Sequence, residues 1–271
     1  MTTMTTRPAG APQGKIVAQM VTTPETEPRL RATIASILPQ VDRMVIVFNR
    51  YDEVPADILV NPAIEAITTD ADTADAGRFF LPPGANDIVF LIDERIGYPA
   101  DYVSRSIEQA TEIGWDGAVF GYKGLIHRSG EDGQPRGWRQ LPYADRLNHP
   151  RGVEMLGTGT VVARGDAIPP IGFMLNYPQD PDVGFALASL RAGRRAWALA
   201  RADGWLRADD DPDAPGNAPP PEDQRPEPPL PVVGGIHEII GAELDHVDVP
   251  HHRYVKAKGG RARPARNDKG A

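Results

Sequence analysis

Cysteine is absent from this sequence of 271 residues. Disulfide bonds and thiolate metal sites are therefore excluded, and the absence is typical of proteins in a reducing compartment. Long apolar runs are also absent, so no segment reaches the length of a transmembrane helix. Residues 1–14 contain Thr, Pro and Gly without an apolar stretch, which excludes an ordinary secretory signal. We therefore expect a cytoplasmic protein without a transmembrane segment.

The sequence also lacks an overall excess of positive charge. Its formal net charge is -8 at pH 7, which gives no global electrostatic reason to bind nucleic acid or an anionic membrane. The last sixteen residues are the exception, because six of them are basic and Asp268 is their single acid. This segment has no apolar periodicity, so we expect a disordered tail, with a contact to a phosphate-rich polymer as the alternative.

Length and composition favour one main domain with appended segments. Residues 208–231 hold nine prolines and seven acids, a composition typical of an extended linker. A short apolar segment follows it. We therefore expect a disordered N-terminus at 1–14, a folded domain at 15–207, the linker at 208–231, a segment docking on the domain at 232–255, and a basic disordered tail at 256–271.

Apolar runs alternate with amphipathic stretches along the expected domain. The runs predict strands at residues 16–21, 44–48, 64–67, 88–92 and 118–120. Helical spacing of apolar residues predicts a helix that Pro39 ends and another that begins at Pro99 and ends at Gly114. This alternation predicts an α/β/α sandwich of the Rossmann type with a mostly parallel central sheet. Ligands are then expected at the carboxyl ends of the strands.

The pattern changes after the fifth strand. Residues 121–152 are polar and Gly-rich, which predicts a long excursion or a β-ribbon. Its Trp138 and Tyr143 could stack on a ligand or simply pack under the loop. Residues 157–163 predict a strand whose small residues allow a close approach to the backbone. A helix with Val183, Leu187 and Leu190 on one face and a last core strand at 196–200 complete the domain.

Two acids follow the apolar run at residues 88–92. Asp93 and Glu94 come directly after it, and Arg95 is next. A carboxylate at the end of a buried strand faces the crevice where ligands bind, and two such acids could hold a cation that neutralises a diphosphate. The alternative is that both acids only begin a loop and cap the following helix.

Five pieces of the domain follow one another in an order that has a parallel in a known family. They are residues 33–42 (TIASILPQVD), 49–55 (NRYDEVP), 75–79 (DAGRF), 93–103 (DERIGYPADYV) and 182–186 (DVGFA). Together they resemble the GT-A fold glycosyltransferases, particularly the family 2-like members, over roughly residues 15–207. The resemblance implies a GT-A-like fold that moves a sugar from a nucleotide-sugar donor to a hydroxyl acceptor, with inversion.

The resemblance also implies a nucleotide pocket at the strand ends. Thr22 and Asn49 would line it, although each could be an ordinary turn or cap residue. Asp75 and Arg78 would approach the nucleotide and its phosphates, for which a guanidinium fork is suited. A surface salt bridge is the alternative for Arg78. The expected donor is a UDP-sugar.

Residues 93–95 fall on the Asp-x-Asp motif with which the family holds a metal and the sugar diphosphate. The resemblance implies a divalent cation, Mn or Mg, at Asp93 and Glu94. Arg95 replaces the last acid of the motif, so either Glu94 substitutes as ligand or Arg95 itself offsets the diphosphate charge. Histidines late in the chain are candidates for a further ligand: His237, His246, His251 and His252.

Asp182 begins the late helix, where the family positions the carboxylate that deprotonates the acceptor. The resemblance therefore implies that Asp182 is the catalytic base, with the nearby Asp180 as alternate. A purely structural role is the competing interpretation, because an Asp in the first turn stabilises a helix whatever the function. The stretch 157–160 (GTGT) is similar to the acceptor-side strand of the family.

We expect a glycosyltransferase whose acceptor is a glycan, a small molecule or a modified nucleic acid. A degenerate family member that binds a nucleotide or glycan without turnover is a second interpretation, which Arg95 favours. A nucleotidyltransferase on a similar sheet is a third, although the sequence has no Gly-rich, basic phosphate loop after its first strand.

Overall fold

The computed structural model describes residues 7–129, 135–208 and 252–255. Its first half contains β1 (Ile16–Thr22), α1 (Glu27–Ile37), the 3-10 turn η1 (Leu38–Gln40), β2 (Arg43–Phe48), α2 (Ala56–Leu59), β3 (Ile64–Thr69), η2 (Ala74–Phe79), β4 (Ile88–Leu91), β5 (Ile96–Gly97) and α3 (Tyr102–Ile113). Its second half contains β6 (Ala118–Gly121), β7 (Gly124–Ser129), β8 (Pro135–Leu141), β9 (Arg151–Val153), β10 (Met155–Leu156), η3 (Thr158–Thr160), β11 (Val162–Arg164), η4 (Gly165–Ala167), α4 (Ile171–Met174), α5 (Pro181–Arg191), β12 (Arg195–Ala198), β13 (Arg207–Ala208) and β14 (His252–Val255).

Nine of the described strands form one central sheet in the order β14-β3-β2-β1-β4-β11-β6-β12-β9. Parallel pairing joins β3, β2, β1 and β4, and it also joins β6 to β12. Antiparallel pairing reverses β11 between β4 and β6, and it reverses β14 and β9 at the two edges. Six strands therefore point one way and three the other, which confirms the prediction of an α/β protein with a mostly parallel central sheet.

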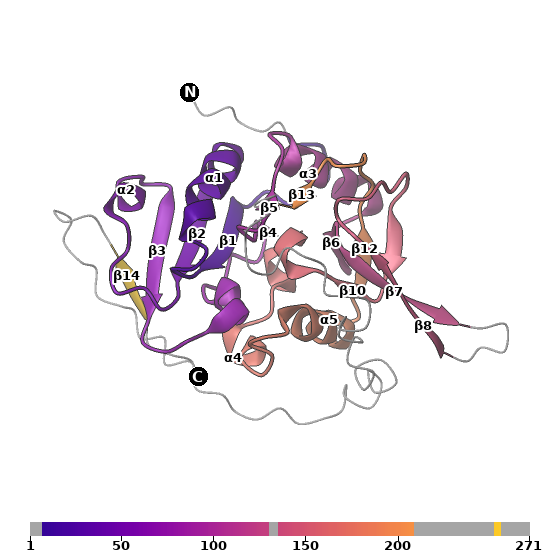
Figure 1. Cartoon of the computed structure of the whole chain (residues 1–271). Helices are drawn as coiled ribbons and strands as arrows, with labels where there is room; N and C mark the ends of the chain where they lie inside the picture. Colours follow the sequence, from indigo (N-terminus) through magenta and orange to yellow (C-terminus); the bar gives the residue numbers. More distant parts are fainter. Residues whose placement is uncertain (1–6, 130–134, 209–251, 256–271) are drawn as a thin grey trace.

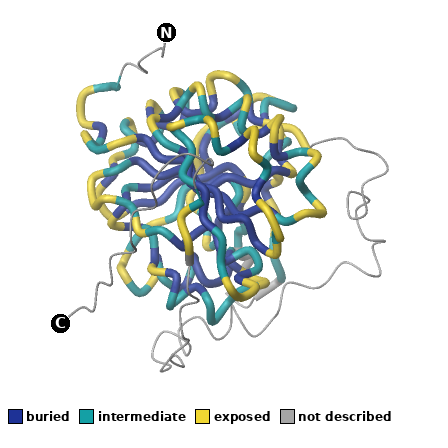
Figure 2. The backbone as a smooth tube through the Cα atoms, turned by 90° about the vertical axis from the view of Figure 1, so that its left-hand side faces the viewer, coloured by how far each residue is buried: buried dark blue, intermediate teal, exposed yellow. Residues whose placement is uncertain are grey.

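Helices cover both faces of this sheet. One buried cluster joins the sheet to α1, α2 and α3 through residues such as Leu30, Ile58 and Ile107, and the other joins it to η2, α4 and α5 through residues such as Met174 and Phe185. Figure 1 shows α1 and α3 above the sheet and α4 and α5 below it. In Figure 2 the buried strands run through the middle of the molecule and the exposed backbone lies at its periphery.

Local sequence accounts for the ends of the main helices. Pro28 occupies the first turn of α1, where its missing N–H is not needed, and Pro39 lies just beyond the last turn. In α3, Val103, Ile107 and Ala110 form the buried face, and Gly114 ends the helix with φ +105°. The helix begins at Tyr102 instead of Pro99. Pro99 lies in the preceding turn, where its carbonyl accepts a hydrogen bond from the Tyr102 N–H at 3.1 Å.

The strand predicted at residues 157–163 is wrong in its extent and is antiparallel to its neighbours. Residues 158–160 form the 3-10 turn η3, and only Val162–Arg164 pair in the sheet. No helix separates β6 from β11, so the chain remains at the carboxyl edge of the sheet and re-enters it in the reverse direction. A parallel return would need a crossover to the opposite edge.

The polar excursion is a β-ribbon, one of the two predicted forms. β7 and β8 pair antiparallel with Ile126 opposite Arg139, and β10 adds to β7 in a three-stranded sheet. Trp138 lies on β8. Figure 1 shows β7 and β8 at the side of the molecule that is remote from β3 and β14.

The folded part begins earlier than predicted. Ala11 is buried against the main core, and the Arg7 guanidinium lies 3.3 Å from the Asp42 carboxylate, so residues 7–14 pack on the domain. At the other end, residues 252–255, the last four of the predicted docking segment at 232–255, form β14 and pair with β3. Residues 209–251 and 256–271, which include most of the predicted linker and the whole basic tail, lie outside the described residues.

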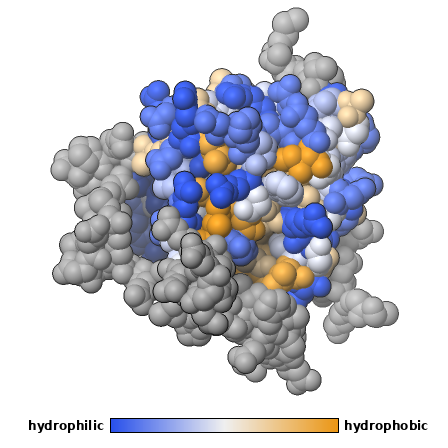
Figure 3. Space-filling view, turned by 90° about the vertical axis from the view of Figure 1, so that its right-hand side faces the viewer, coloured by the Kyte–Doolittle hydropathy of each residue, from blue (hydrophilic) through white to orange (hydrophobic). Residues whose placement is uncertain are grey.

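Large apolar side chains are mostly buried in the described part of the chain. Val60, Leu190 and Tyr254 are the exposed exceptions, so Leu190 does not belong to the buried face of α5 on which it was expected. The face in Figure 3 is largely hydrophilic, with small groups of apolar residues near its middle. Across residues 7–129, 135–208 and 252–255, every helix is too short or too polar to cross a membrane.

Candidate functional site

A cavity of about 360 Å³ lies at the carboxyl ends of β1, β2 and β4. The chain moves from β1 outward to β2 and β3 and then returns to β4 on the other side of β1, and such a reversal of strand order opens a crevice for ligands. Polar side chains of Asn49, Arg78, Asp93, Glu94 and Arg95 line the cavity, so the predicted strand-end residues meet there. We call this space the first cavity.

A second cavity of about 550 Å³ adjoins the first. Five residues line both spaces: Asp75, Arg78, Asp93, Arg95 and Gln179. The far wall of the second cavity comes from the later part of the chain and includes Lys123, Tyr143, residues 157–160, Asp180 and Asp182. A ligand could therefore extend from one cavity into the other past the shared charged residues.

Asp93 is held at this junction by a buried tyrosine. Its backbone N–H donates to the Tyr98 hydroxyl at 2.9 Å, and this hydroxyl donates to the Gly159 carbonyl at 2.6 Å. A Cβ at position 159 would lie 2.8 Å from the Asp93 Cβ, closer than two such atoms can pack. The close approach predicted at residues 157–163 is therefore made in part by Asp93, and a side chain at 159 would force a shift in one of the two segments.

Arg95 clamps the Asp93 carboxylate with two hydrogen bonds. Its Nε donates to Oδ1 at 2.8 Å and its Nη2 to Oδ2 at 2.6 Å, while the Arg95 backbone N–H also donates to Oδ1. Burial raises the pKa of Asp93, but these hydrogen bonds and the charge of Arg78 outweigh burial and hold the pKa well below its ordinary value. Asp93 is therefore a carboxylate at neutral pH, and it orients Arg95.

Arg78 is the buried cation of the junction. Its side chain is 3% exposed, and its Nη2 lies 3.2 Å from Asp75 Oδ1 and 3.6 Å from Asp93 Oδ2. Its Nε also donates to the Asp75 carbonyl. The alternative of a surface salt bridge is therefore wrong, because Arg78 is an interior part of the site that reaches both cavities.

Glu94 lies beside this cluster in the first cavity and is 6% exposed. Burial and the neighbouring negative charge of Asp93 raise its pKa to about 7, against a hydrogen bond with Thr26 that acts in the opposite direction. Near neutral pH this carboxyl group therefore titrates. Its protonated form would leave the two guanidinium groups with less competing negative charge.

Asn49 is buried at the end of β2 and organises the wall next to it. Its Nδ2 donates to Asp72 Oδ1 at 2.6 Å, and its Oδ1 accepts from the Thr73 N–H at 3.2 Å. The hydrogen bond from Asn49 lowers the pKa of Asp72. Sequence reasoning missed Asp72, although its position just after a strand in the acid-rich segment 70–75 was a usable signal.

Thr22 is buried without lining either cavity. Its hydroxyl lies 3.4 Å from the Tyr51 hydroxyl, on the face of β1 that turns away from the site. The neighbouring Val21 and Thr23 line the first cavity instead, because successive side chains of a strand point to opposite faces.

Asp182 faces the second cavity from the first turn of α5. Its Oδ1 accepts hydrogen bonds from the Thr158 N–H and the Thr158 hydroxyl, both at 2.7 Å, and its Oδ2 lies 3.6 Å from the Lys123 ammonium. Sequence reasoning did not select Lys123. Asp180 and Tyr143 also line this cavity, whereas Trp138 is not among its lining residues.

The described residues fit a divalent cation poorly. Both oxygens of Asp93 are taken by Arg95, and no group of three or more His, Asp or Glu side chains within the described ranges could surround a metal. His237, His246 and His251 lie outside those ranges, as does the side chain of His252. A cation at Asp93 and Glu94 stays a prediction.

Comparisons with families and curated proteins found no relative of this sequence. No model of a protein family matches the sequence, and no curated protein matches it either. The two joined cavities and the residues that line them are therefore the features that bear on function.

Proposed function

We propose that this protein is a GT-A-like glycosyltransferase that transfers a sugar from a nucleotide-sugar donor to a hydroxyl acceptor with inversion. The supporting observation is the pair of joined cavities, which place the carboxylate of Asp182 in one and share the guanidinium groups of Arg78 and Arg95. The resemblance of the sequence to this family and the mostly parallel sheet are in accord with the proposal.

The first cavity offers groups suited to the donor. Asn49 and Asp72 supply amide and carboxylate groups that can donate hydrogen bonds to a nucleoside or accept them from it, and the two guanidinium groups can pair with its diphosphate. Arg95 keeps part of its fork available, because Asp93 engages only its Nε and Nη2 and half of its side chain is exposed. A UDP-sugar is the proposed donor.

The second cavity offers the base. As the acceptor oxygen forms its bond to the anomeric carbon, its proton passes to Asp182 Oδ2, and the bond from that carbon to the diphosphate oxygen breaks with the electron pair on the leaving group. Arg78 and Arg95 stabilise the departing diphosphate. Thr158 fixes the orientation of Asp182 through its two hydrogen bonds to Oδ1.

A protein that binds nucleotide without turnover is the second candidate. One observation favours it: the only acid of the Asp93-Glu94-Arg95 stretch that ionises readily is already neutralised by Arg95 within the fold. Such a protein would bind a nucleoside diphosphate at Arg78 and Arg95 but leave the donor intact.

A donor screen separates the two candidates. The purified chain is incubated with a panel of nucleotide sugars, and release of nucleoside diphosphate is measured by chromatography with and without added acceptors and manganese. Thermal-shift titration with the free nucleoside diphosphates runs in parallel. We expect one diphosphate to raise the melting temperature and its sugar conjugate to be consumed. Binding without consumption would support the second candidate, and the absence of both would contradict the proposal.

Metal dependence is tested at Arg95. If the Arg95 guanidinium supplies the positive charge that a metal ion supplies in enzymes with the full Asp-x-Asp motif, the unmodified chain should retain activity in the presence of a chelator. Arg95→Asp should then depend on manganese, because it adds an acid beside Asp93 and removes the clamp. An unmodified chain that is inactive in chelator and fully restored by manganese would contradict this role of Arg95.

A further inference from the structure

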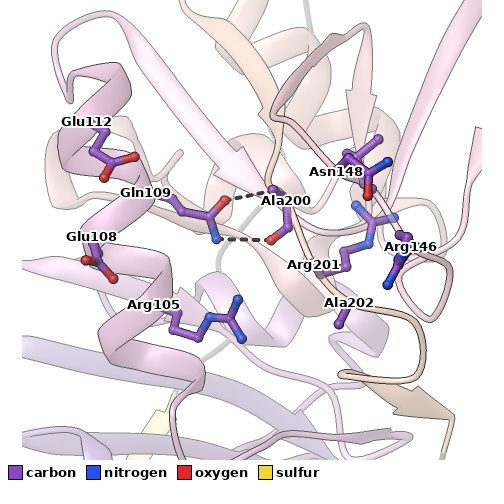
Figure 4. A pocket seen from close by; sticks show the side chains of 10 residues that line it. Arg105, Glu108, Gln109, Glu112, Arg146, Asn148, Ala200, Arg201 and Ala202 are labelled. Atoms are coloured by element: carbon purple, nitrogen blue, oxygen red, sulfur yellow. Dashed lines mark hydrogen bonds between the residues drawn. The ribbon is translucent and has the colours of Figure 1, made fainter.

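A third cavity of about 520 Å³ lies between α3 and the chain that follows β12. One wall is formed by Arg105, Glu108, Gln109 and Glu112 of α3, and the other by residues 146–148 and 200–202 (Figure 4). It shares no lining residue with the two cavities of the proposed donor and acceptor. Its volume is in the range that holds a small organic molecule.

Hydrogen bonds hold the two walls at a fixed distance. The Gln109 amide donates to the Ala200 carbonyl at 3.0 Å and accepts from the Ala200 N–H at 2.8 Å, as the dashed lines in Figure 4 show. The backbone of Arg201 pairs in both directions with that of Leu147, at 3.0 and 2.9 Å. The cavity is therefore preformed by long-range contacts and does not need a ligand to assemble it.

Arg201 carries a buried charge whose hydrogen bonds go to backbone carbonyls instead of to an acid. The residue is 4% exposed, and its Nη1 and Nη2 donate to the carbonyls of Leu199 and Pro142. Its Nε is buried without a hydrogen-bond partner, and among the described residues Asp145 is the carboxylate whose charge acts on it, with no hydrogen bond between the two side chains. Burial lowers the pKa of Arg201, and the charge of Asp145 opposes this shift. An anion in the adjoining cavity would compensate this charge.

Charges are separated between the walls of the cavity. Arg146 lies next to Arg201 on the wall opposite α3, whereas Glu108 and Glu112 lie on α3 (Figure 4). Arg105 also lines the cavity, but it pairs with Asp101 at 3.5 Å and stacks on Trp205 at 4.9 Å. A fitting ligand therefore has an anionic group for Arg146 and Arg201 and hydrogen-bond donors for the two glutamates.

We propose that this cavity binds a small phosphorylated polyol, with its phosphate at Arg146 and Arg201 and its hydroxyl groups at Glu108 and Glu112. Phosphate provides several acceptor oxygens for guanidinium groups, and hydroxyl groups donate to carboxylates without adding charge. The proposal does not depend on the proposed transferase activity, since it concerns a separate cavity.

The test is a calorimetric titration of the full chain with glycerol phosphate and, separately, with inorganic phosphate. We expect saturable binding of glycerol phosphate, tighter than that of inorganic phosphate. Arg146→Gln should weaken it ~10-fold through loss of a charge-assisted hydrogen bond, while Arg195→Gln, an exposed charge change outside the cavity, should not. Arg95→Gln should also leave it unchanged, which excludes binding at the proposed diphosphate site.

Glu108→Gln identifies which part of the ligand is recognised. It should reduce the preference for glycerol phosphate over inorganic phosphate, because it removes an acceptor for the hydroxyl groups. Equal affinity of the unmodified chain for both probes would support an anion site and overturn the polyol assignment. Absence of binding, or binding that Arg95→Gln abolishes and Arg146→Gln retains, would overturn the whole proposal.

Discussion

The two halves of the central sheet contribute to the site in different ways. In the first half, the parallel strands β1, β2 and β4 end at the same edge of the sheet. Residues that follow these strands, such as Asn49 and Asp93, therefore line the same cavity. In the second half, the β-ribbon and the reversed strand β11 bring Lys123, Thr158 and Asp182 together from three separate segments. The first half therefore positions its site residues through the regular topology of the sheet. The second half positions them through specific contacts between segments that are distant in sequence.

Burial differs between the two halves as well. In the first half the side chains of Arg78 and Asp93 are 3% and 11% exposed, whereas in the second half those of Lys123 and Asp182 are 53% and 28% exposed. Interior charges need their partners for the fold to be stable, and charges near the surface need them much less. Substitutions in the first half should therefore act on stability, and those in the second half mainly on chemistry.

The largest effect is expected at Arg78. Arg78→Met removes the buried partner of Asp75 and Asp93, so we expect the free energy of unfolding to fall by about 3–5 kcal/mol. Urea denaturation measures it. Arg31→Met, which breaks an exposed pair with Asp57, is the control and should cost about 0–1 kcal/mol. If both variants lose the same amount of unfolding free energy, burial does not decide how much a charge pair contributes to stability.

Glu94 should make stability depend on pH. Its pKa in the folded chain is about 7, above the ordinary value of 4.5, so its contribution is fully present below the ordinary value and is lost as pH rises towards 7. Glu94→Gln removes this loss and should stabilise the chain by roughly 3 kcal/mol at most near pH 8, with little effect near pH 4. Urea denaturation at several pH values tests this, and exposed Glu53→Gln is the control.

Binding of nucleoside diphosphate should follow the same titration. The ionised Glu94 repels an anion in the first cavity, so affinity should fall as pH rises through about 7, and Glu94→Gln should abolish this dependence. A pH dependence that persists in the variant would assign the titration to the ligand or to another group.

Asp182 is the sharpest test of the second half. Asp182→Asn keeps the shape of the side chain but removes the base, so transfer should fall about 100-fold or more while binding of nucleoside diphosphate persists. Stability should change little because the side chain is partly exposed. Asp180→Asn is the matched control at the same end of α5. Near-normal transfer in both variants would remove Asp182 from catalysis.

The smallest effect concerns the contact between the halves. Gly159→Ala places a Cβ against Asp93 and should cost about 1–2 kcal/mol of stability through overpacking, with weaker diphosphate binding. Gly152→Ala adds the same atom where nothing lies within 4 Å, so it serves as control. Thermal denaturation and calorimetry measure both. An unchanged affinity in Gly159→Ala would show that the position of Asp93 does not depend on this contact.

Sequence reasoning predicted that Asn49, Asp93 and Glu94 lie at the strand ends, where they line the first cavity, because the signals for buried strands are local. A run such as residues 88–92 predicts a buried strand, and parallel strands place the residues that follow them at one edge. Thr22 shows the limit of this logic. Thr22 lies at the end of a strand, as does Asn49, but the alternation of side chains along the strand directs it to the face opposite the cavity. Both faces of this central strand are buried, so the sequence pattern does not indicate which residues face the cavity.

The second half was harder to predict because its partners are distant in sequence. Lys123 and Asp182 are separated by 59 positions, and only the return of β11 beside β6 brings their segments together. The short run after Gly157 predicts a strand, and nothing local distinguishes a parallel from an antiparallel entry. β11 is antiparallel to its neighbours because no helical crossover lies between β6 and β11 in the described part of the chain. This depends on the path of the whole chain between the two strands.

By itself, the sequence determined the alternation of strands and helices, the carboxylates at a strand end and the departure at Arg95, because each depends on apolar periodicity or residue identity over a few positions. Only the tertiary structure decided that Arg95 binds Asp93 on both oxygens, that Glu94 is buried enough to titrate near neutrality, and that the Nε of Arg201 is buried without a hydrogen-bond partner. Burial and charge pairing arise from segments far apart along the chain, and they set the electrostatics of the site.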